Sequence, residues 1–91
     1  MKFSKTVRTY MALALEEGTV SSMSGTCDGF HREIFWTVHK YSPSLLTGDK
    51  IEYGAWASPL YGETVWSANL EDLLDKLEAL IDKARKVGIP A

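Results

Sequence analysis

Between residues 67 and 90 the apolar side chains recur at spacings of three and four, the period of an amphipathic helix. The stripe consists of Leu70, Leu73, Leu74, Leu77, Leu80, Ile81 and Ala84. Asn69 or Ser67 can cap the first amides, and Gly88 with Pro90 would end the helix. Because the stripe is wide and covers only two heptads, it favours packing on a sheet over a coiled coil.

Residues 4–17 are ambiguous, because their apolar side chains fit either a helix or an alternating strand. The run Met11–Leu15 consists largely of strong helix formers. Ser4 can cap a helix here, and Gly18 can terminate it. These signals favour a helix over residues 4–17.

The middle of the chain reads as a loop followed by strands. Residues 18–29 are rich in Gly, Ser and Thr, which predicts a loop with a short strand near residues 19–23 and a turn at Asp28-Gly29. Alternating apolar and polar side chains then predict strands at residues 31–41, 50–57 and 63–68.

Short connections between these strands favour an antiparallel meander. The expected fold is therefore one small α+β domain over residues 1–91, in the order α-β-β-β-α. It would contain a three-stranded antiparallel sheet, with both helices packed on one face.

Strand alternation divides the sheet residues between two faces. The face beneath the helices would hold Ile34, Trp36, Val38, Ile51, Tyr53, Ala55 and Val65. The other face would hold Phe35, Trp56 and Trp66, surrounded by His39, Glu33 and Glu52. Aromatic side chains gathered on an open sheet face are typical of a contact surface. Two alternatives stay open: the helix over residues 4–17 covers this face as ordinary core, or a second copy of the chain does.

The composition is that of an ordinary soluble globular domain, with 45% hydrophobic and 24% charged residues among 91. Ten basic and twelve acidic residues give a formal charge of −2, so the basic footprint of nucleic-acid-binding proteins is missing. Residues 41–91 carry five basic and eight acidic groups, and the acidic excess lies chiefly between Glu63 and Glu78.

The single cysteine, Cys27, excludes an intrachain disulfide and favours a reducing compartment. The apolar run Met11–Leu15 is too short for a signal-peptide core or a membrane span. We therefore expect a cytoplasmic protein.

Residues suited to catalysis or metal binding do not form a recognisable set. Cys27 and His31 supply only half of a zinc ligand set, even with Asp28 and Glu33 nearby. Cys27 could also pair with His31 or His39 as thiolate and base, if the fold brought them together. The serines near residue 22 lie in no nucleophile-elbow pattern, and the Gly-rich loop lacks the Lys-Ser/Thr of a P-loop. We expect no enzymatic activity, no cofactor and no metal.

The expected element order resembles that of the double-stranded-RNA-binding domain, and the resemblance is one of order only. That family is expected to carry lysines at the start of its final helix to grip phosphates. This chain has Glu71, Asp72 and Asp75 there, which would repel phosphates.

The expected function is that of a non-enzymatic regulatory or inhibitory protein that binds another protein. The surface would be the aromatic sheet face or the acidic start of the final helix, with candidate residues Phe35, His39, Glu52, Trp56, Trp66, Glu71 and Asp72. An inhibitor encoded by a phage or mobile element, occluding a basic surface of a host protein, would fit the acidic second half by analogy of size and fold. The alternatives are a nucleic-acid-binding module that uses the aromatic face and a small homodimeric structural protein.

Overall fold

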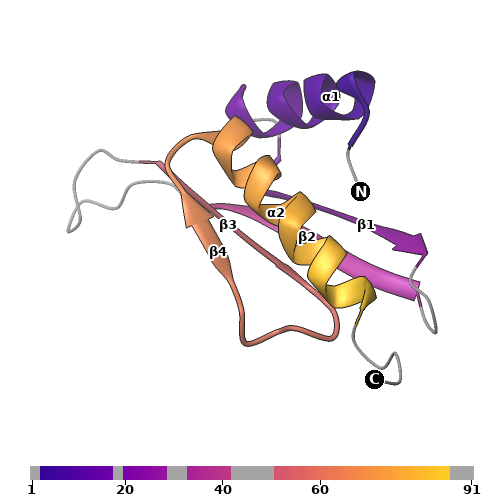
Figure 1. The fold of residues 1–91 in the computed structure, drawn as a ribbon. Helices are drawn as coiled ribbons and strands as arrows, with labels where there is room; N and C mark the ends of the chain where they lie inside the picture. Colours follow the sequence, from indigo (N-terminus) through magenta and orange to yellow (C-terminus); the bar gives the residue numbers. More distant parts are fainter. Residues whose placement is uncertain (1–2, 18–19, 29–32, 42–50, 87–91) are drawn as a thin grey trace.

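The computed structural model describes residues 3–17, 20–28, 33–41 and 51–86. The elements follow in the order α1 (Lys5–Glu16), β1 (Ser22–Asp28), β2 (Glu33–Tyr41), β3 (Glu52–Ala57), β4 (Val65–Ser67) and α2 (Leu70–Arg85). All four strands form one antiparallel sheet in the order β1-β2-β3-β4 (Figure 1). The fold is therefore α+β with an open antiparallel sheet, and the prediction of three strands was wrong by one.

The additional strand is β1, where the composition predicted mostly loop. It pairs with β2 along its whole length, from Ser22 opposite His39 to Asp28 opposite Glu33. Gly and Ser have weak strand preferences, yet Gly25 leaves the space that the Trp36 indole fills. A Cβ atom at Gly25 would lie 2.6 Å from Cζ2 of Trp36. Packing across the strands thus outweighs the local preference, and the order α-β-β-β-β-α departs from that of the RNA-binding domain.

Both helices form where the sequence predicts them. In α1 the Ser4 hydroxyl accepts a hydrogen bond from the Val7 N–H at 3.1 Å. In α2 the Asn69 side chain accepts one from the Asp72 N–H at 3.0 Å. Every residue of the predicted apolar stripe of α2 is buried. The expected stop signals at Gly88 and Pro90 lie outside the described residues.

The helices lie on the same face of the sheet, as predicted (Figure 1). α2 lies across β2, β3 and β4, whereas α1 contacts α2 and the edge strand β1. The core joins Met11 and Leu15 of α1 to the stripe of α2 and to Ile34, Trp36, Val38, Tyr53, Ala55 and Ala57 of the sheet. Burial of these apolar groups supplies the main driving force for the layered fold.

Two core predictions need correction. Ile51 precedes β3 and is 38% exposed, because pairing of this strand with β2 begins only at Glu52. Val65 is half-buried and packs against the margin of the core, since β4 is an edge strand of three residues. The predicted strand over residues 63–68 is thus shorter at both ends. The connection before it contains a cis Ser58–Pro59 peptide bond.

Candidate functional site

The sheet face opposite the helices carries a group of aromatic side chains. Antiparallel pairing fixes which residues share this face: Thr37 is opposite Trp56, His39 and Trp66 are both opposite Gly54, and Tyr41 is opposite Glu52. We call Phe35, His39, Tyr41, Trp56 and Trp66 the aromatic face. Four of its members were predicted as contact residues, all but Tyr41, and a fifth predicted residue, Glu52, lies at its border.

Four rings of the aromatic face, all but that of Phe35, contact one another in a continuous row. Trp56 stacks on His39 with ring centroids 4.6 Å apart and an angle of 13° between the planes. His39 lies 6.2 Å from Tyr41, and Tyr41 lies 5.2 Å from Trp66. Such pairs contribute about 0.5–1.5 kcal/mol each beyond the burial of their area. The row therefore orders side chains from three strands into one preformed surface.

Gly54 is what allows Trp66 to join this row. A Cβ atom at Gly54 would lie 2.8 Å from Cζ3 of Trp66, so the indole rests directly on the backbone of the neighbouring strand. On the helix side, Lys76 of α2 donates a hydrogen bond to the Trp66 carbonyl oxygen at 2.9 Å. The short strand β4 is thus held at Trp66 from both faces.

Phe35 is held by backbone contacts at the other end of the face. Its N–H donates to the Ser58 hydroxyl at 2.9 Å, and its carbonyl oxygen accepts from the Ser58 N–H at 2.8 Å. The second bond, between backbone groups, continues the β2–β3 pairing by one residue beyond Ala57. The position of Phe35 is therefore fixed even though its side chain is exposed.

The aromatic face is open to solvent among the described residues. Phe35 is 44% exposed, and Tyr41 and Trp66 are each 45% exposed. Thr37 beneath them is buried, and Trp56 and His39 are half-buried. Since α1 packs on the opposite face, the alternative in which residues 4–17 cover the aromatics is wrong.

Among the described residues of the strands, the charges bordering the aromatic face are acidic. Glu33 and Glu52 lie on this face and are exposed. Lys40 is the one Lys or Arg within the described strands, and it belongs to the helix side, where its Nζ donates to the Leu15 carbonyl oxygen at 2.7 Å. The face is therefore apolar at its centre, with carboxylates at its border.

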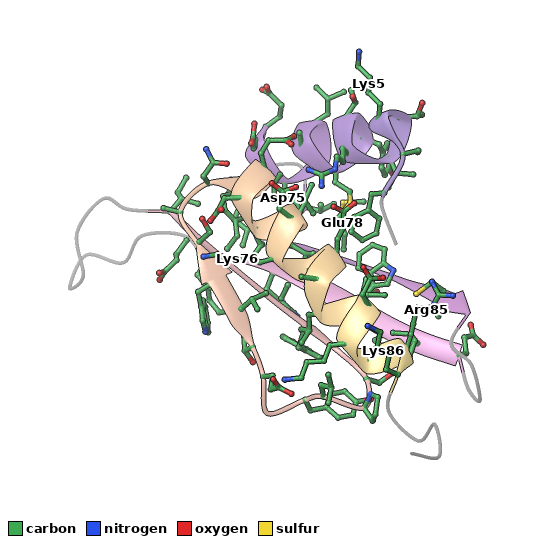
Figure 2. The ribbon with its side chains drawn as sticks, in the orientation of Figure 1. Lys5, Asp75, Lys76, Glu78, Arg85 and Lys86 are labelled. Carbon is green, nitrogen blue, oxygen red and sulfur yellow. The ribbon has the colours of Figure 1, made fainter. Side chains whose placement is uncertain are left out.

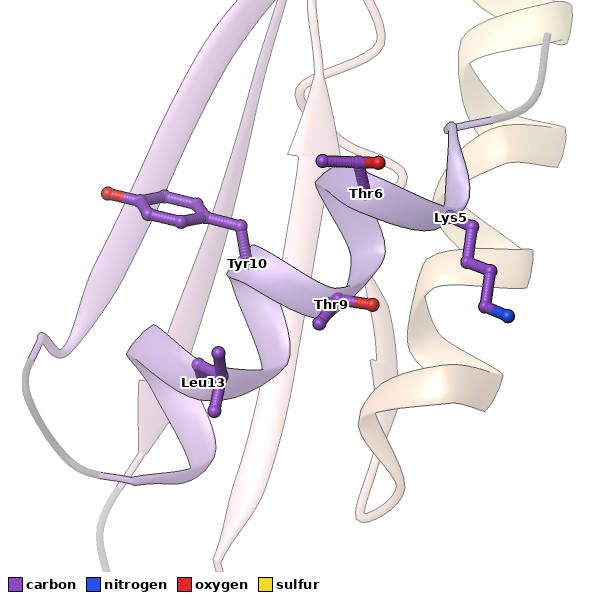
Figure 3. A pocket seen from close by; sticks show the side chains of 5 residues that line it. All are labelled: Lys5, Thr6, Thr9, Tyr10 and Leu13. Carbon is purple, nitrogen blue, oxygen red and sulfur yellow. The ribbon is translucent and has the colours of Figure 1, made fainter.

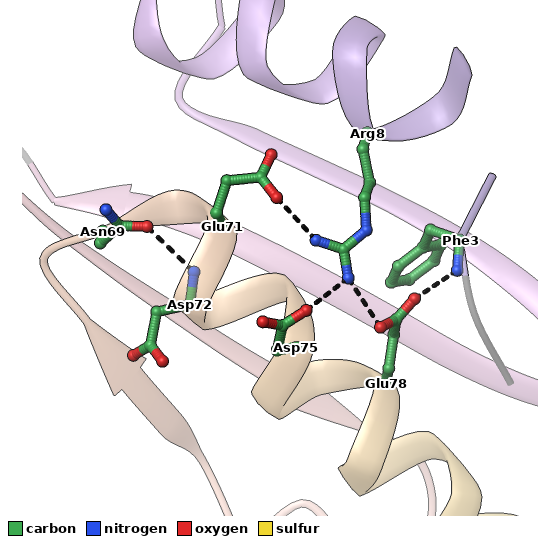
Figure 4. Close-up of polar contacts among 7 residues, drawn as sticks. All are labelled: Phe3, Arg8, Asn69, Glu71, Asp72, Asp75 and Glu78. Atoms are coloured by element: carbon green, nitrogen blue, oxygen red, sulfur yellow. Dashed lines mark hydrogen bonds and ion pairs between the residues drawn. The ribbon is translucent and has the colours of Figure 1, made fainter. Parts of the chain in front are cut away.

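The acidic start of α2 forms a separate cluster around Arg8 of α1 (Figure 4), and Figure 2 labels two of its acidic residues, Asp75 and Glu78, where α2 passes close to α1. Arg8 contacts Glu71 at 2.8 Å, Asp75 at 2.7 Å and Glu78 at 2.6 Å. Glu78 is buried and also accepts a hydrogen bond from the Phe3 N–H. Partial burial opposes the charge of Arg8, but its bonds to Asp75 and Glu78 outweigh that effect and raise its pKa.

Asp72 is also engaged within the chain. Its carboxylate lies 3.2 Å from Nζ of Lys76, one helical turn further on. The Ser67 hydroxyl and then Lys76 hydrogen-bond the carboxylate and lower the pKa of Asp72. Glu71 and Asp72 thus lie on the helix layer, paired with cations of the same chain, and the fold does not bring them to the aromatic face.

The residues considered for catalysis do not meet. Cys27 lies opposite Ile34 and packs against the core, whereas His39 lies on the aromatic face, so the sheet separates the two. Nε2 of His39 is buried and has no hydrogen-bond partner among the residues that the structure describes. His31 lies outside the described residues. Within the described ranges, no three side chains of the kinds that ligate metals come together.

Sequence reasoning missed three parts of this arrangement. Tyr41 shares the alternation of Phe35 and His39, so strand period alone would have added it to the aromatic face. Gly54 has a weaker signal, because a glycine inside a strand often marks a close approach. No local sequence signal marks Arg8, because its partners lie more than 60 residues away in sequence.

Comparisons with protein families, with characterised proteins and with solved structures find no match to this chain. In the part of the chain that the structure describes, neither helix has the length and apolarity needed to cross a membrane. The case for a function therefore rests on the surface itself.

Proposed function

We propose that the protein is a non-enzymatic regulator or inhibitor that binds another protein through the aromatic face. The observation that carries the proposal is the continuous row of ring contacts from Trp56 to Trp66 on an open sheet surface. Trp and Tyr dominate the energetic centres of protein interfaces because they bury large areas at little entropic cost. A preformed row lowers that cost further.

The partner surface is proposed to be basic. Glu33 and Glu52 border the aromatic face, and no Lys or Arg of the described strands lies on it. Lysine and arginine side chains would gain ion pairs with these carboxylates and cation–π contacts with the exposed indole. The acidic start of α2 should contribute less to binding a basic partner than its formal charge suggests, because Arg8 and Lys76 already pair with its carboxylates.

Nucleic acid fits the same face less well. Aromatic side chains can stack bases, but single-stranded nucleic-acid sites combine them with cations that track the phosphates. Here the border carboxylates would repel those phosphates. The further idea of a cytoplasmic inhibitor from a phage or mobile element rests on size and fold by analogy.

Titrations with defined probes test the proposal. The probes are peptides of equal length that are basic and apolar, acidic and apolar, or neutral, together with a single-stranded oligonucleotide. We expect tryptophan fluorescence and calorimetry to detect only the basic peptides. Because a central interface residue contributes about 2 kcal/mol or more, Trp66→Ala should weaken binding more than about tenfold.

A matched control is Tyr61→Ala, which removes another exposed aromatic, 60% exposed, from the connection before β4. It should leave peptide binding unchanged, and Glu52→Lys should weaken it by reversing a border charge. Binding that survives Trp66→Ala would contradict the proposed surface. Preference for the oligonucleotide, or indifference to every basic peptide, would contradict the proposed partner.

A further inference from the structure

The helix α1 presents a second exposed apolar surface, on the side of the helix away from the strands (Figure 3). Tyr10 is 65% exposed and Leu13 is 57% exposed. We call Thr6, Thr9, Tyr10, Leu13 and Ala14 the outer stripe of α1. One shallow hollow of about 420 Å³ extends from Tyr10 and Leu13 toward Lys5, and another of about 400 Å³ extends toward Glu17.

The charges of α1 are arranged against its own dipole. Lys5 opens the helix and Glu16 with Glu17 closes it, so its first turn has no acid and its last turn no base. The positive end of a helix dipole prefers acids, and its negative end prefers bases. α2 follows this preference at both ends. The arrangement in α1 is therefore unfavourable for the helix alone, and a contact that brings opposite charges to both of its ends would offset that cost.

We propose that the outer stripe of α1 binds the outer stripe of a second copy of this chain, with the two helices antiparallel about a two-fold axis. Such pairing places Tyr10 against the partner's Leu13 and Thr9 against the partner's Ala14. It also brings Lys5 near the partner's Glu17, because they lie about 10 Å and about 8 Å along the helix from the point midway between Tyr10 and Leu13, at about 1.5 Å per residue.

The second copy is the occupant that this charge pattern selects. A two-fold contact joins a surface to itself, so every group must meet its own complement in the other copy. Lys5 and Glu17 satisfy that condition only when the helices run antiparallel. The small side chains of Thr6, Thr9 and Ala14 permit close approach of the helices, and antiparallel dipoles attract each other.

The dimer would be weak and would leave the aromatic faces free. One pair of short helices buries less area than a standard stable interface, so association should depend on concentration. α1 lies on the face of the sheet opposite the aromatic row, and neither copy would cover the aromatics of the other. If the proposed function holds, the dimer is a two-site binder whose avidity for a repeated partner exceeds that of the monomer.

Sedimentation velocity from low micromolar to millimolar concentration tests the pairing. The wild-type chain should shift from monomer to dimer, and Leu13→Glu should weaken the dimer more than about tenfold without unfolding, since the side chain is exposed. Lys5→Glu and Glu17→Lys should each weaken the dimer at low salt, while the double variant should restore it. Each single change corrects the dipole mismatch, so the dilute monomer should not lose thermal stability.

The two proposals fail separately. Leu13→Glu should abolish dimerisation and keep peptide binding, whereas Trp66→Ala should keep dimerisation and lose peptide binding. A chain that stays monomeric at every concentration would overturn the inference, even if its outer stripe bound anionic lipid vesicles instead. Loss of the dimer in Trp66→Ala but not in Leu13→Glu would also overturn it, by locating the contact on the sheet. A double charge variant that fails to restore association would overturn the antiparallel arrangement.

Discussion

On each face of the sheet an indole rests on a glycine of the neighbouring strand, but one indole is buried and the other is exposed. On the covered face the indole of Trp36 rests on Gly25 of the neighbouring strand, meets Phe3 edge-on at 5.2 Å and is 8% exposed. On the open face the indole of Trp66 rests on Gly54 and is 45% exposed. The two indoles therefore make the same kind of contact with the neighbouring strand. The helix layer lies on the face of Trp36, which becomes part of the core, and leaves Trp66 available for contact.

The largest expected contrast is between the two tryptophan truncations. Trp36→Ala should lower the free energy of unfolding by about 3–5 kcal/mol, because it leaves a cavity in the core beside Gly25 and Phe3. Trp66→Ala should lower it by only about 1–2 kcal/mol, because 45% of this residue is already exposed and the truncation removes only its contacts with Gly54 and Tyr41. Urea denaturation of both variants measures the difference. Equal losses would mean that the aromatic face is structural and would remove the basis for a binding surface.

The two glycines give a smaller contrast of the same kind. In Gly25→Ala the new methyl group collides with an indole that the core holds in place, so we expect a loss of about 1–3 kcal/mol. In Gly54→Ala the Trp66 ring can swing toward solvent, and the loss should stay below about 1 kcal/mol. Chemical denaturation checks both values.

The same two glycine variants should also differ in peptide binding. Displacing the Trp66 ring should break its contact with Tyr41, so Gly54→Ala should weaken binding of the basic peptide while Gly25→Ala spares it. The reverse ranking of stabilities would show that the open-face indole is the more rigid of the two.

The sequence predicts the faces well because alternation is a local property. Once residues 33–41 form a strand, Ile34 and Phe35 must point to opposite sides of the sheet. The same holds for the stripe of α2, whose period and capping residues are contained in one segment. Phe35, Trp56 and Trp66 lie on one face because strands that follow one another in sequence pair as an antiparallel meander.

What the sequence did not predict depends on contacts between distant segments. β1 forms despite its Gly and Ser because β2 supplies backbone partners and the Trp36 ring covers Gly25. Arg8, near the other end of the chain, forms ion pairs with three carboxylates of α2 and so neutralises much of the charge at the start of that helix. Composition shows that acids and bases are present, but only the fold shows which of them meet.

Alkaline titration gives the smallest effect, at one tyrosine of the covered face. Tyr53 lies on the covered face, 5% exposed, and burial, followed by the charge of Glu16, raises its pKa. Above its ordinary pKa of about 10, the unfolded chain therefore ionises this tyrosine before the folded chain does. The stabilising contribution of Tyr53 is present below about pH 10 and is lost as the pH rises through its folded pKa.

The variant that isolates this effect is Tyr53→Phe, which should lose less stability than the wild type between about pH 9 and about pH 11. The wild type is the reference, and urea denaturation at each pH gives the two curves. Since lysines and other tyrosines titrate in the same range, the result is the difference between Tyr53→Phe and the wild type at each pH, and not the absolute loss. A Tyr53→Phe curve that paralleled the wild type across this range would mean that burial on the covered face does not raise the pKa of Tyr53, contrary to the packing that makes this face the core.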